Sequence, residues 1–193
     1  AKEIDAIGGH LDAFTSREYT AFYLNLLVDH LERGMEILSD ILLHSTFPAN
    51  EVERERRVIL EEIRSAEDNP EDCAYELLVQ GLWGGSPLGR PILGSPASVG
   101  KVPRARLLEF FANNYRSGNL VFAAAGGVTH EHLERLWRRH FPFPKRAHNP
   151  ARQRAPRVKP GLYSRPRDLE QIYLNYACAG LEQDHADRYA LYV

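Results

Sequence analysis

The segment that most constrains the fold of this chain reads Glu53-Arg54-Glu55-Arg56-Arg57-Val58-Ile59-Leu60-Glu61-Glu62-Ile63. Helical counting puts Glu55 and Glu62 on one face, two turns apart, with Val58 and Ile59 between them. A carboxylate on an apolar stripe is costly to bury unless a cation or hydrogen-bond donors meet it. A surface helix rich in ion pairs is the simpler interpretation of the spacing alone, so the surrounding sequence has to decide.

The composition is that of an ordinary globular protein. Of its 193 residues, 44% are hydrophobic and 26% are charged, a length that suits one domain or one and a half. The net charge of −2 gives no general attraction to nucleic acid or anionic membranes. No apolar run is long enough to span a bilayer, and no signal peptide is visible. Cys73 and Cys178 are far apart and are interpreted as free thiols.

Around this segment the pattern predicts strands and helices without a βαβ rhythm, which favours an α+β fold. Extended segments are expected at 10–14 and 19–28, joined by a polar turn, and a further apolar strand at 119–125. Helices are expected at about 30–44, 51–67, 70–83, 103–113 and 129–140, with Asp29, Asn50 and Thr129 at their starts.

The segment 141–161 differs from the rest in its five prolines and its many arginines. We interpret it as a linker between a first domain at 1–140 and the start of a second domain at 162–193, with a strand at 169–179 and a helix beginning near 184. Its basic residues lack interleaved aromatic side chains, so a tether is preferred over a nucleic-acid contact.

Four segments together carry a resemblance to a known family. They are Gly8-Gly9-His10-Leu11-Asp12-Ala13-Phe14-Thr15-Ser16-Arg17-Glu18-Tyr19-Thr20, the segment 53–63 quoted above, Pro87-Leu88-Gly89-Arg90-Pro91-Ile92-Leu93-Gly94, and Asn119-Leu120-Val121-Phe122-Ala123-Ala124-Ala125-Gly126. In this order they resemble the pitrilysin-type (M16) zinc peptidases, above all the bacterial members similar to mitochondrial processing peptidase. The resemblance implies an α+β unit with a mixed, largely antiparallel sheet flanked by helices, followed by a homologous second unit.

The resemblance also implies a set of site residues. In the family two histidines of an HxxEH motif and a glutamate from a later helix hold Zn²⁺, and the glutamate matches Glu62 here. A second glutamate that supports the site matches Glu55. The segment Asp12, Ala13, Phe14 and Thr15 matches the strand to which peptide substrate adds as a further strand. The family often has Asn where this chain has Asp12, a change that puts a negative charge beside the substrate path.

The HxxEH motif does not occur in this sequence. By the family's order it is expected upstream of Ala1, so we expect this chain to supply one zinc ligand of three and to be inactive alone. The nearest alternative, His130-Glu131-His132, has i, i+2 spacing that puts its histidines on different sides of a helix, and we interpret it as a solvated first turn.

The leading hypothesis is therefore part of a zinc metalloendopeptidase that hydrolyses peptides or unfolded polypeptides. The expected partners are a peptide substrate and a homologous second half or partner subunit; an exposed sheet edge also makes a homodimer an expected state. The alternative is a non-catalytic M16-like scaffold or substrate-binding subunit, and a third reading is an unrelated helical interaction domain. The compartment stays open between bacterial cytoplasm and periplasm.

Overall fold

The computed structural model describes residues 2–143, 156 and 158–192. Its helices and strands are α1 (Lys2–Ala6), β1 (His10–Thr15), β2 (Thr20–Asn25), α2 (Leu31–His44), α3 (Ala49–Asp68), α4 (Pro70–Trp83), α5 (Pro96–Val99), α6 (Arg104–Asn114) and α7 (His130–His140), with short 3₁₀ turns between them. The chain divides into a first compact unit, residues 1–58 with 97–153, and a second, residues 59–96 with 154–193. The helices and the antiparallel strand pair confirm the α+β class.

The hairpin of the first unit forms where two extended segments joined by a polar turn were predicted. β1 and β2 pair antiparallel in a register that joins His10 to Asn25 and Thr15 to Thr20. In the turn, Ser16 N–H donates to the carbonyl of Tyr19 at 2.8 Å, and Ser16 Oγ accepts from Tyr19 N–H at 3.1 Å. Short polar side chains that bond nearby backbone favour such turns, which fixes the register. The second strand ends at Asn25, three residues before the predicted end.

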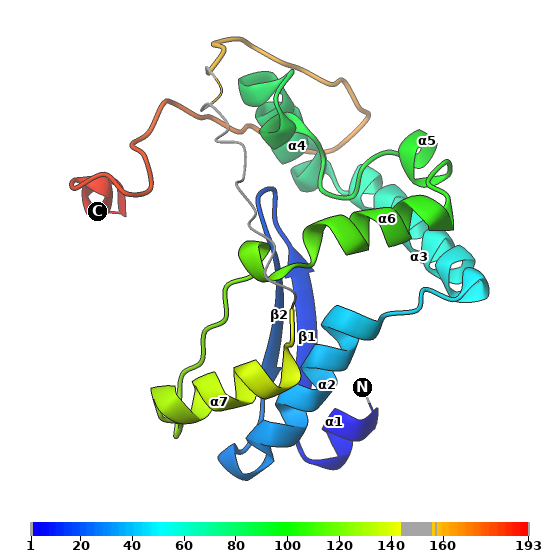
Figure 1. The fold of residues 1–193 in the computed structure, drawn as a ribbon. Helices are drawn as coiled ribbons and strands as arrows, with labels where there is room; N and C mark the ends of the chain where they lie inside the picture. Colours follow the sequence, from blue (N-terminus) through cyan, green and yellow to red (C-terminus); the bar gives the residue numbers. More distant parts are fainter. Residues whose placement is uncertain (1, 144–155, 157, 193) are drawn as a thin grey trace. The chain divides into compact units, whose positions relative to one another are not determined.

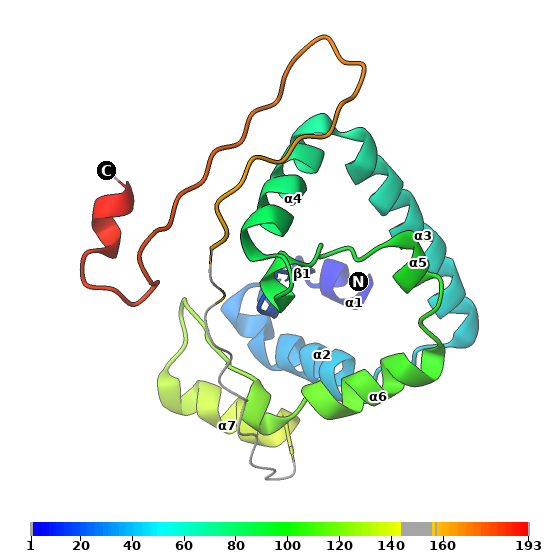
Figure 2. The same cartoon turned by 90° about the horizontal axis from the view of Figure 1, so that it is seen from above.

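The core of the first unit lies between α2 and α7, which lie side by side (Figures 1 and 2). Its buried residues are Met35, Leu38, Leu42, Leu136 and Phe141. On α2 they recur at helical spacing, so one face of this helix is apolar. Phe22 and Leu24 of β2 and Phe122 of a later segment pack against the same core. The hairpin and residues near 122 therefore cover one hydrophobic layer.

The helix starts show which predicted caps operate. Thr129 Oγ1 accepts from His132 N–H at 3.3 Å and caps α7 as predicted. Asn69 Oδ1 accepts from Glu71 N–H at 3.0 Å and caps α4, where Pro70 lacks a donor to satisfy. The predicted cap at Asn50 is wrong, because α3 begins at Ala49 and the Asn50 amide donates to Glu51 Oε1 instead. Asp29 lies in a 3₁₀ turn before α2 and does not cap it.

In the second unit, α4 is contacted by the chain that follows residue 158. Tyr163 Oη donates to the carbonyl of Gly81 at 3.2 Å, and its ring lies where a Cβ at position 81 would be. Glycine at position 81 thus allows the ring to approach the helix backbone. Arg167 Nη1 donates to the carbonyl of Glu67 at 2.6 Å.

Two predicted strands, 119–125 and 169–179, are wrong: within the described residues neither belongs to a ladder. An apolar segment becomes a strand only when a neighbouring strand satisfies its backbone donors and acceptors, which sequence pattern alone cannot guarantee. The helix expected from residue 184 is a short 3₁₀ turn, Arg188–Tyr192. The predicted linker 141–161 lies mostly outside the described residues.

Candidate functional site

The two predicted site glutamates lie on α3, and both side chains are exposed. The face of α3 that is buried or half-buried runs through Val52, Arg56, Ile59, Ile63 and Ala66, with Ile63 the most buried. The prediction that Glu55 and Glu62 share a buried stripe with Val58 is therefore wrong, since Val58 is itself 42% exposed. The carboxylates lie beside the buried face rather than on it, where water solvates them at little cost.

Ion pairs occupy three other acidic residues of the same helix. Glu51 pairs with Arg54, Glu53 with Arg56, and Glu61 with Arg64, each at i, i+3 spacing. Among the residues that the structure describes, the side chains of Glu55 and Glu62 have no hydrogen bond or ion pair. The carboxylate oxygens of the two glutamates singled out from the sequence are thus available to another group, as are those of Glu67 and Asp68 at the end of the helix.

Arg56 anchors this helix within the first unit. Its guanidinium donates to the carbonyls of Val99 and Val102, the latter at 2.8 Å, and to Glu53 Oε2 at 3.0 Å. The Arg56 side chain is only 16% exposed, so these bonds fix the rotation of α3 about its axis where Arg56 lies. The same rotation sets the direction in which the neighbouring Glu55 projects.

A zinc ion needs three or four donors at one point, and the described residues do not supply them. No group of three or more His, Cys, Asp or Glu side chains gathers there into a metal-binding cluster. Glu62 offers one exposed carboxylate, and a single carboxylate does not make a zinc site. His130 and His132 do not supply the remainder, since they lie in the first turn of α7 with exposed side chains.

The predicted substrate strand, Asp12 to Thr15, lies in β1 and is exposed along its length. Ser16 and Tyr19 form a hydrogen-bonded pair, and such pairs alternate with non-bonded ones along an antiparallel ladder. It follows that Leu11, Ala13 and Thr15 direct their N–H and C=O groups away from β2. These are the backbone groups that an added peptide strand would use.

Asp12 already occupies one of those groups. Its Oδ1 accepts from Ala13 N–H at 2.8 Å, and its Oδ2 accepts from the phenol of Tyr23 at 2.9 Å. The hydrogen bond from Ala13, followed by that from Tyr23, holds the pKa of the Asp12 carboxyl below its usual value. The same bond to Asp12 raises the pKa of the Tyr23 phenol. The carboxylate thus lies fixed at the middle of the predicted substrate strand.

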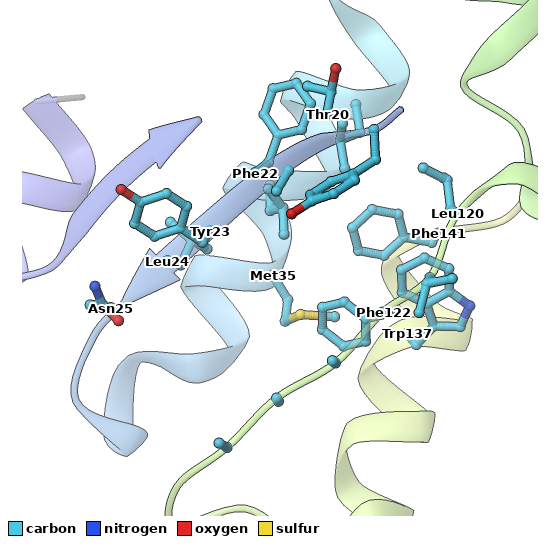
Figure 3. A pocket seen from close by; sticks show the side chains of 18 of the residues that line it. Thr20, Phe22, Tyr23, Leu24, Asn25, Met35, Leu120, Phe122, Trp137 and Phe141 are labelled. Atoms are coloured by element: carbon cyan, nitrogen blue, oxygen red, sulfur yellow. The ribbon is translucent and has the colours of Figure 1, made fainter. Parts of the chain in front are cut away.

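A cleft on the other side of the hairpin was missed by the sequence analysis. It has a volume of about 1140 Å³ and is lined by every residue of β2 and by every residue from Leu120 to Val128. Its floor is the apolar face of α2, with Trp137 and Phe141 at one end. In Figure 3, Leu120, Phe122, Trp137 and Phe141 gather across the cleft from β2. We call this the β2 cleft. The sequence feature that could have indicated it is the apolar segment 119–125, which was predicted as a strand although no partner strand was predicted for it.

None of the helices in the described part of the chain combines the length and the apolar character that a membrane span requires.

Comparisons with known proteins give two similar sequences and a similar structure. An uncharacterized zinc protease of Mycobacterium leprae is 36% identical over 200 aligned positions, covering 100% of this chain and 44% of that protein. An uncharacterized zinc protease of Bacillus subtilis is 30% identical over 193, covering 100% and 47%. The crystal structure of a peptidase M16 inactive domain from Pseudomonas fluorescens shares the fold with a TM-score of 0.73 at 23% identity, covering 80% of this chain and 38% of that chain.

The chain therefore spans less than half the length of these relatives. Two family models match it in succession. Residues 1–96 match the model described as insulinase, peptidase family M16, and residues 101–193 match the one described as peptidase M16 inactive domain. Glu55, Glu62 and the hairpin all fall within the first match. The chain belongs to the M16 family of peptidases.

Proposed function

We propose that this chain is part of a zinc-dependent metalloendopeptidase that hydrolyses peptides or unfolded polypeptides, and that Glu62 is its contribution to the metal site. The observation that carries the proposal is the availability of Glu62. It lies on an exposed helix face, without a partner among the described residues, while Glu61 beside it is paired with Arg64. Zinc protease names among the relatives support the same assignment.

The remaining zinc ligands and the general base would come from another part of the protein. A bound zinc ion supplies Lewis-acid activation of the scissile carbonyl and of water. Glu62 would donate one carboxylate oxygen to the ion, and Glu55, two turns away on α3, would hold the surroundings of that ligand in place. Alone, the chain is expected to be inactive.

The outer edge of β1 would bind the substrate. Leu11, Ala13 and Thr15 present backbone groups to a peptide that lies beside them as a further strand, so sequence-independent hydrogen bonds give affinity. Side chains on the exposed face then give preference: Phe14 contacts Tyr19 and Tyr23, with ring centroids 5.7 and 6.4 Å apart. The fixed negative charge of Asp12 favours peptides that carry a basic residue at that point.

The test uses the complete gene product that contains this chain. Glu62→Gln is expected to abolish stoichiometric zinc, measured by metal analysis, and cleavage of an unfolded polypeptide. Glu61→Gln is the matched control, because it removes one carboxylate from the adjacent position but leaves zinc and cleavage intact. Glu55→Gln is expected to lower zinc affinity by roughly 10–100-fold. Retention of zinc by Glu62→Gln would refute the ligand assignment.

One observation favours a second candidate, a non-catalytic subunit that grips peptide substrate or serves as a scaffold. Residues 101–193 match the model described as an inactive domain. The same gene product separates the two: a scaffold binds unfolded peptide through β1 without zinc and without cleavage. The homologous second half or partner subunit that either candidate requires is part of both proposals.

A further inference from the structure

Residues 159–167, which form neither helix nor strand, run beside α4 and contact both of its ends (Figure 2). Lys159 N–H donates to the carbonyl of Leu82 at the end of the helix, at 3.3 Å. Arg167 Nη1 lies 3.6 Å from Cys73 Sγ near the start of the helix. We call this segment the strap. It belongs to the part of the chain that matches the inactive-domain model, whereas α4 belongs to the part that matches the insulinase model.

Tyr163 is the side chain that attaches the middle of the strap to α4. It is 44% exposed, whereas the adjacent Leu162 is 94% exposed, so the strap directs Tyr163 towards the helix. The ring lies against Gly81, which is buried, and a Cβ at that position would be 2.4 Å from ring atom Cε2. Glycine is a poor helix former, and here its missing side chain leaves the space that the ring fills.

The strap also supplies hydrogen-bond donors to two helix ends. The last four carbonyls of a helix have no donor within that helix. At the end of α4, the Lys159 N–H and the Tyr163 phenol each donate to a carbonyl of the last turn, at 3.3 and 3.2 Å. At the end of α3, Arg167 Nη1 donates to the carbonyl of Glu67 at 2.6 Å. The attached strap therefore caps the C-terminal ends of both helices.

The end of α3 lies close to Glu62. The carbonyl of Glu67 accepts from Arg167 of the strap and from the Cys73 thiol of α4, the latter at 3.1 Å. Helix ends fray, and donors to their carbonyls oppose this. Glu62 lies about a turn and a half before Glu67, so the same bonds restrict the turn that carries its carboxylate. A ligand held in place beforehand loses less conformational freedom when it binds.

We propose that the strap is a conformational coupling device, attached to α4 by the Tyr163 ring at Gly81, which holds the end of α3 and preorganises Glu62 for zinc. Release of the strap would let this end of α3 fray and would weaken zinc binding. Every residue from 159 to 167 is exposed, so few contacts oppose its release. The coupling to Glu62 rests on the proposed function, whereas the attachment at Gly81 does not.

Residue-resolved amide hydrogen exchange on the complete gene product tests the attachment. Gly81→Ala adds a Cβ where the ring lies and should make the Lys159 amide exchange about tenfold faster or more, because its bond to the Leu82 carbonyl is lost. Tyr163→Ala should give the same increase. The amide of Val79 inside α4 is the internal control, and its exchange should not rise, because alanine favours a helix more than glycine does.

The double variant separates the ring contact from other effects of the substitutions. Once Tyr163→Ala has removed the ring, Gly81→Ala has nothing to displace, so it should change the exchange of Lys159 no further. Tyr163→Phe keeps the ring without its hydroxyl and should raise the exchange less than Tyr163→Ala. Unchanged exchange of Lys159 in Gly81→Ala, or additive effects in the double variant, would overturn the attachment. An equal rise at Val79 would do the same, since α4 itself would then be opening.

Zinc titration of the same variants tests the coupling to Glu62. Gly81→Ala should weaken zinc binding roughly 2–30-fold, with no further loss when it is combined with Tyr163→Ala. Fast exchange at Lys159 with unchanged zinc affinity would overturn the coupling. If Glu62→Gln retains zinc, the proposed function and the coupling fail together. The attachment at Gly81 is then still decided by the exchange of Lys159, which depends on neither zinc nor cleavage.

Discussion

The two outer edges of the β1–β2 hairpin differ in what lies beside them. Along β1 the outward backbone groups face solvent, and the Asp12 carboxylate already accepts the hydrogen bond of Ala13 N–H. Along β2 the outward groups face a cleft with an apolar floor, and no side chain of the described residues caps them. The outer edge of β1 thus carries a carboxylate bonded to its backbone, whereas the outer edge of β2 has no such side chain and lies above the apolar core.

The difference indicates two kinds of partner. A charged side chain on an edge strand discourages permanent pairing and aggregation, yet it can be displaced by a peptide that binds briefly. An unguarded edge above buried apolar side chains gains hydrophobic burial as well as hydrogen bonds when a strand is added, which suits a permanent occupant. The proposed transient binding of peptide therefore fits the β1 edge better than the β2 edge.

The largest expected effect comes from the floor of the β2 cleft. Leu38→Ala removes a side chain that is 6% exposed and should lower the free energy of unfolding by about 2–5 kcal/mol. Phe14→Ala, on the solvent face of β1, removes a larger side chain that is 48% exposed and should cost clearly less. Urea unfolding of both variants measures the contrast, and equal losses would contradict the different burial of the two faces.

The next contrast uses Thr15 and Thr20, which face each other across the hairpin. Proline at either position removes one outward N–H and the contact between the two hydroxyls, 3.2 Å apart, so the pair is matched. In the complete gene product Thr15→Pro should raise the KM for peptide, because it removes a backbone donor from the proposed binding edge. Thr20→Pro should leave that KM unchanged, because its N–H faces the β2 cleft.

If Thr20→Pro raised the KM for peptide and Thr15→Pro did not, the outer edge of β2 and not that of β1 would bind the peptide. No change in KM for either variant would show that neither outer edge binds the peptide.

Local patterns predicted the hairpin, α2, α4 and α7 from the sequence, because each depends on neighbouring residues. Ser16 fixes the turn, Asn69 and Thr129 cap their helices, and the apolar spacing of α2 needs only its own face. The segments 119–125 and 169–179 were predicted as strands from the same kind of pattern. Their pairing depends on a distant strand, and none is present among the described residues.

For the candidate site, the sequence singled out the helix α3 but not which of its faces is exposed. Glu62 was assigned from its place in a motif, whereas its exposure depends on which face of α3 carries Ile63 and Arg56. The contacts of Arg56 with Val99 and Val102 join residues more than forty positions apart, which no local pattern encodes. The bonds from Asp12 to Ala13 and Tyr23 required the register of the hairpin as well.

A smaller effect is expected from removing the Asp12 carboxylate from the edge of β1. Asp12→Ala frees Ala13 N–H for an incoming peptide, while Asp12→Asn keeps an acceptor at the same place without its charge. If the carboxylate competes with substrate and also attracts basic residues, Asp12→Ala should lower the KM for a neutral peptide by a few-fold and raise it for a basic one. Equal KM changes for neutral and basic peptides would mean that only the freed Ala13 N–H affects binding and that the charge of Asp12 does not.

The smallest expected effect is on the titration of the Tyr23 phenol. Its hydrogen bond to Asp12 raises the pKa of Tyr23, and the bonds from Ala13 and then Tyr23 lower the pKa of Asp12. A raised folded pKa stabilises the hairpin below the ordinary tyrosine pKa, and this contribution is lost as pH rises through the raised value. A lowered carboxyl pKa stabilises it above the ordinary aspartate pKa, and this contribution is lost as pH falls through the lowered value.

The Asp12–Tyr23 hydrogen bond therefore stabilises the hairpin at pH values between the lowered pKa of Asp12 and the raised pKa of Tyr23. Asp12→Ala should remove this stabilisation and its loss at both the acid and the alkaline limit. In the variant, the Tyr23 ring, followed by NMR of labelled tyrosine, should titrate nearer its ordinary pKa of about 10. Tyr115 is the control, because burial and not Asp12 raises the pKa of its phenol. If the titration of Tyr23 is unchanged, the carboxylate does not hold the phenol. Only the bond from Ala13 N–H would then hold the Asp12 carboxylate at the β1 edge.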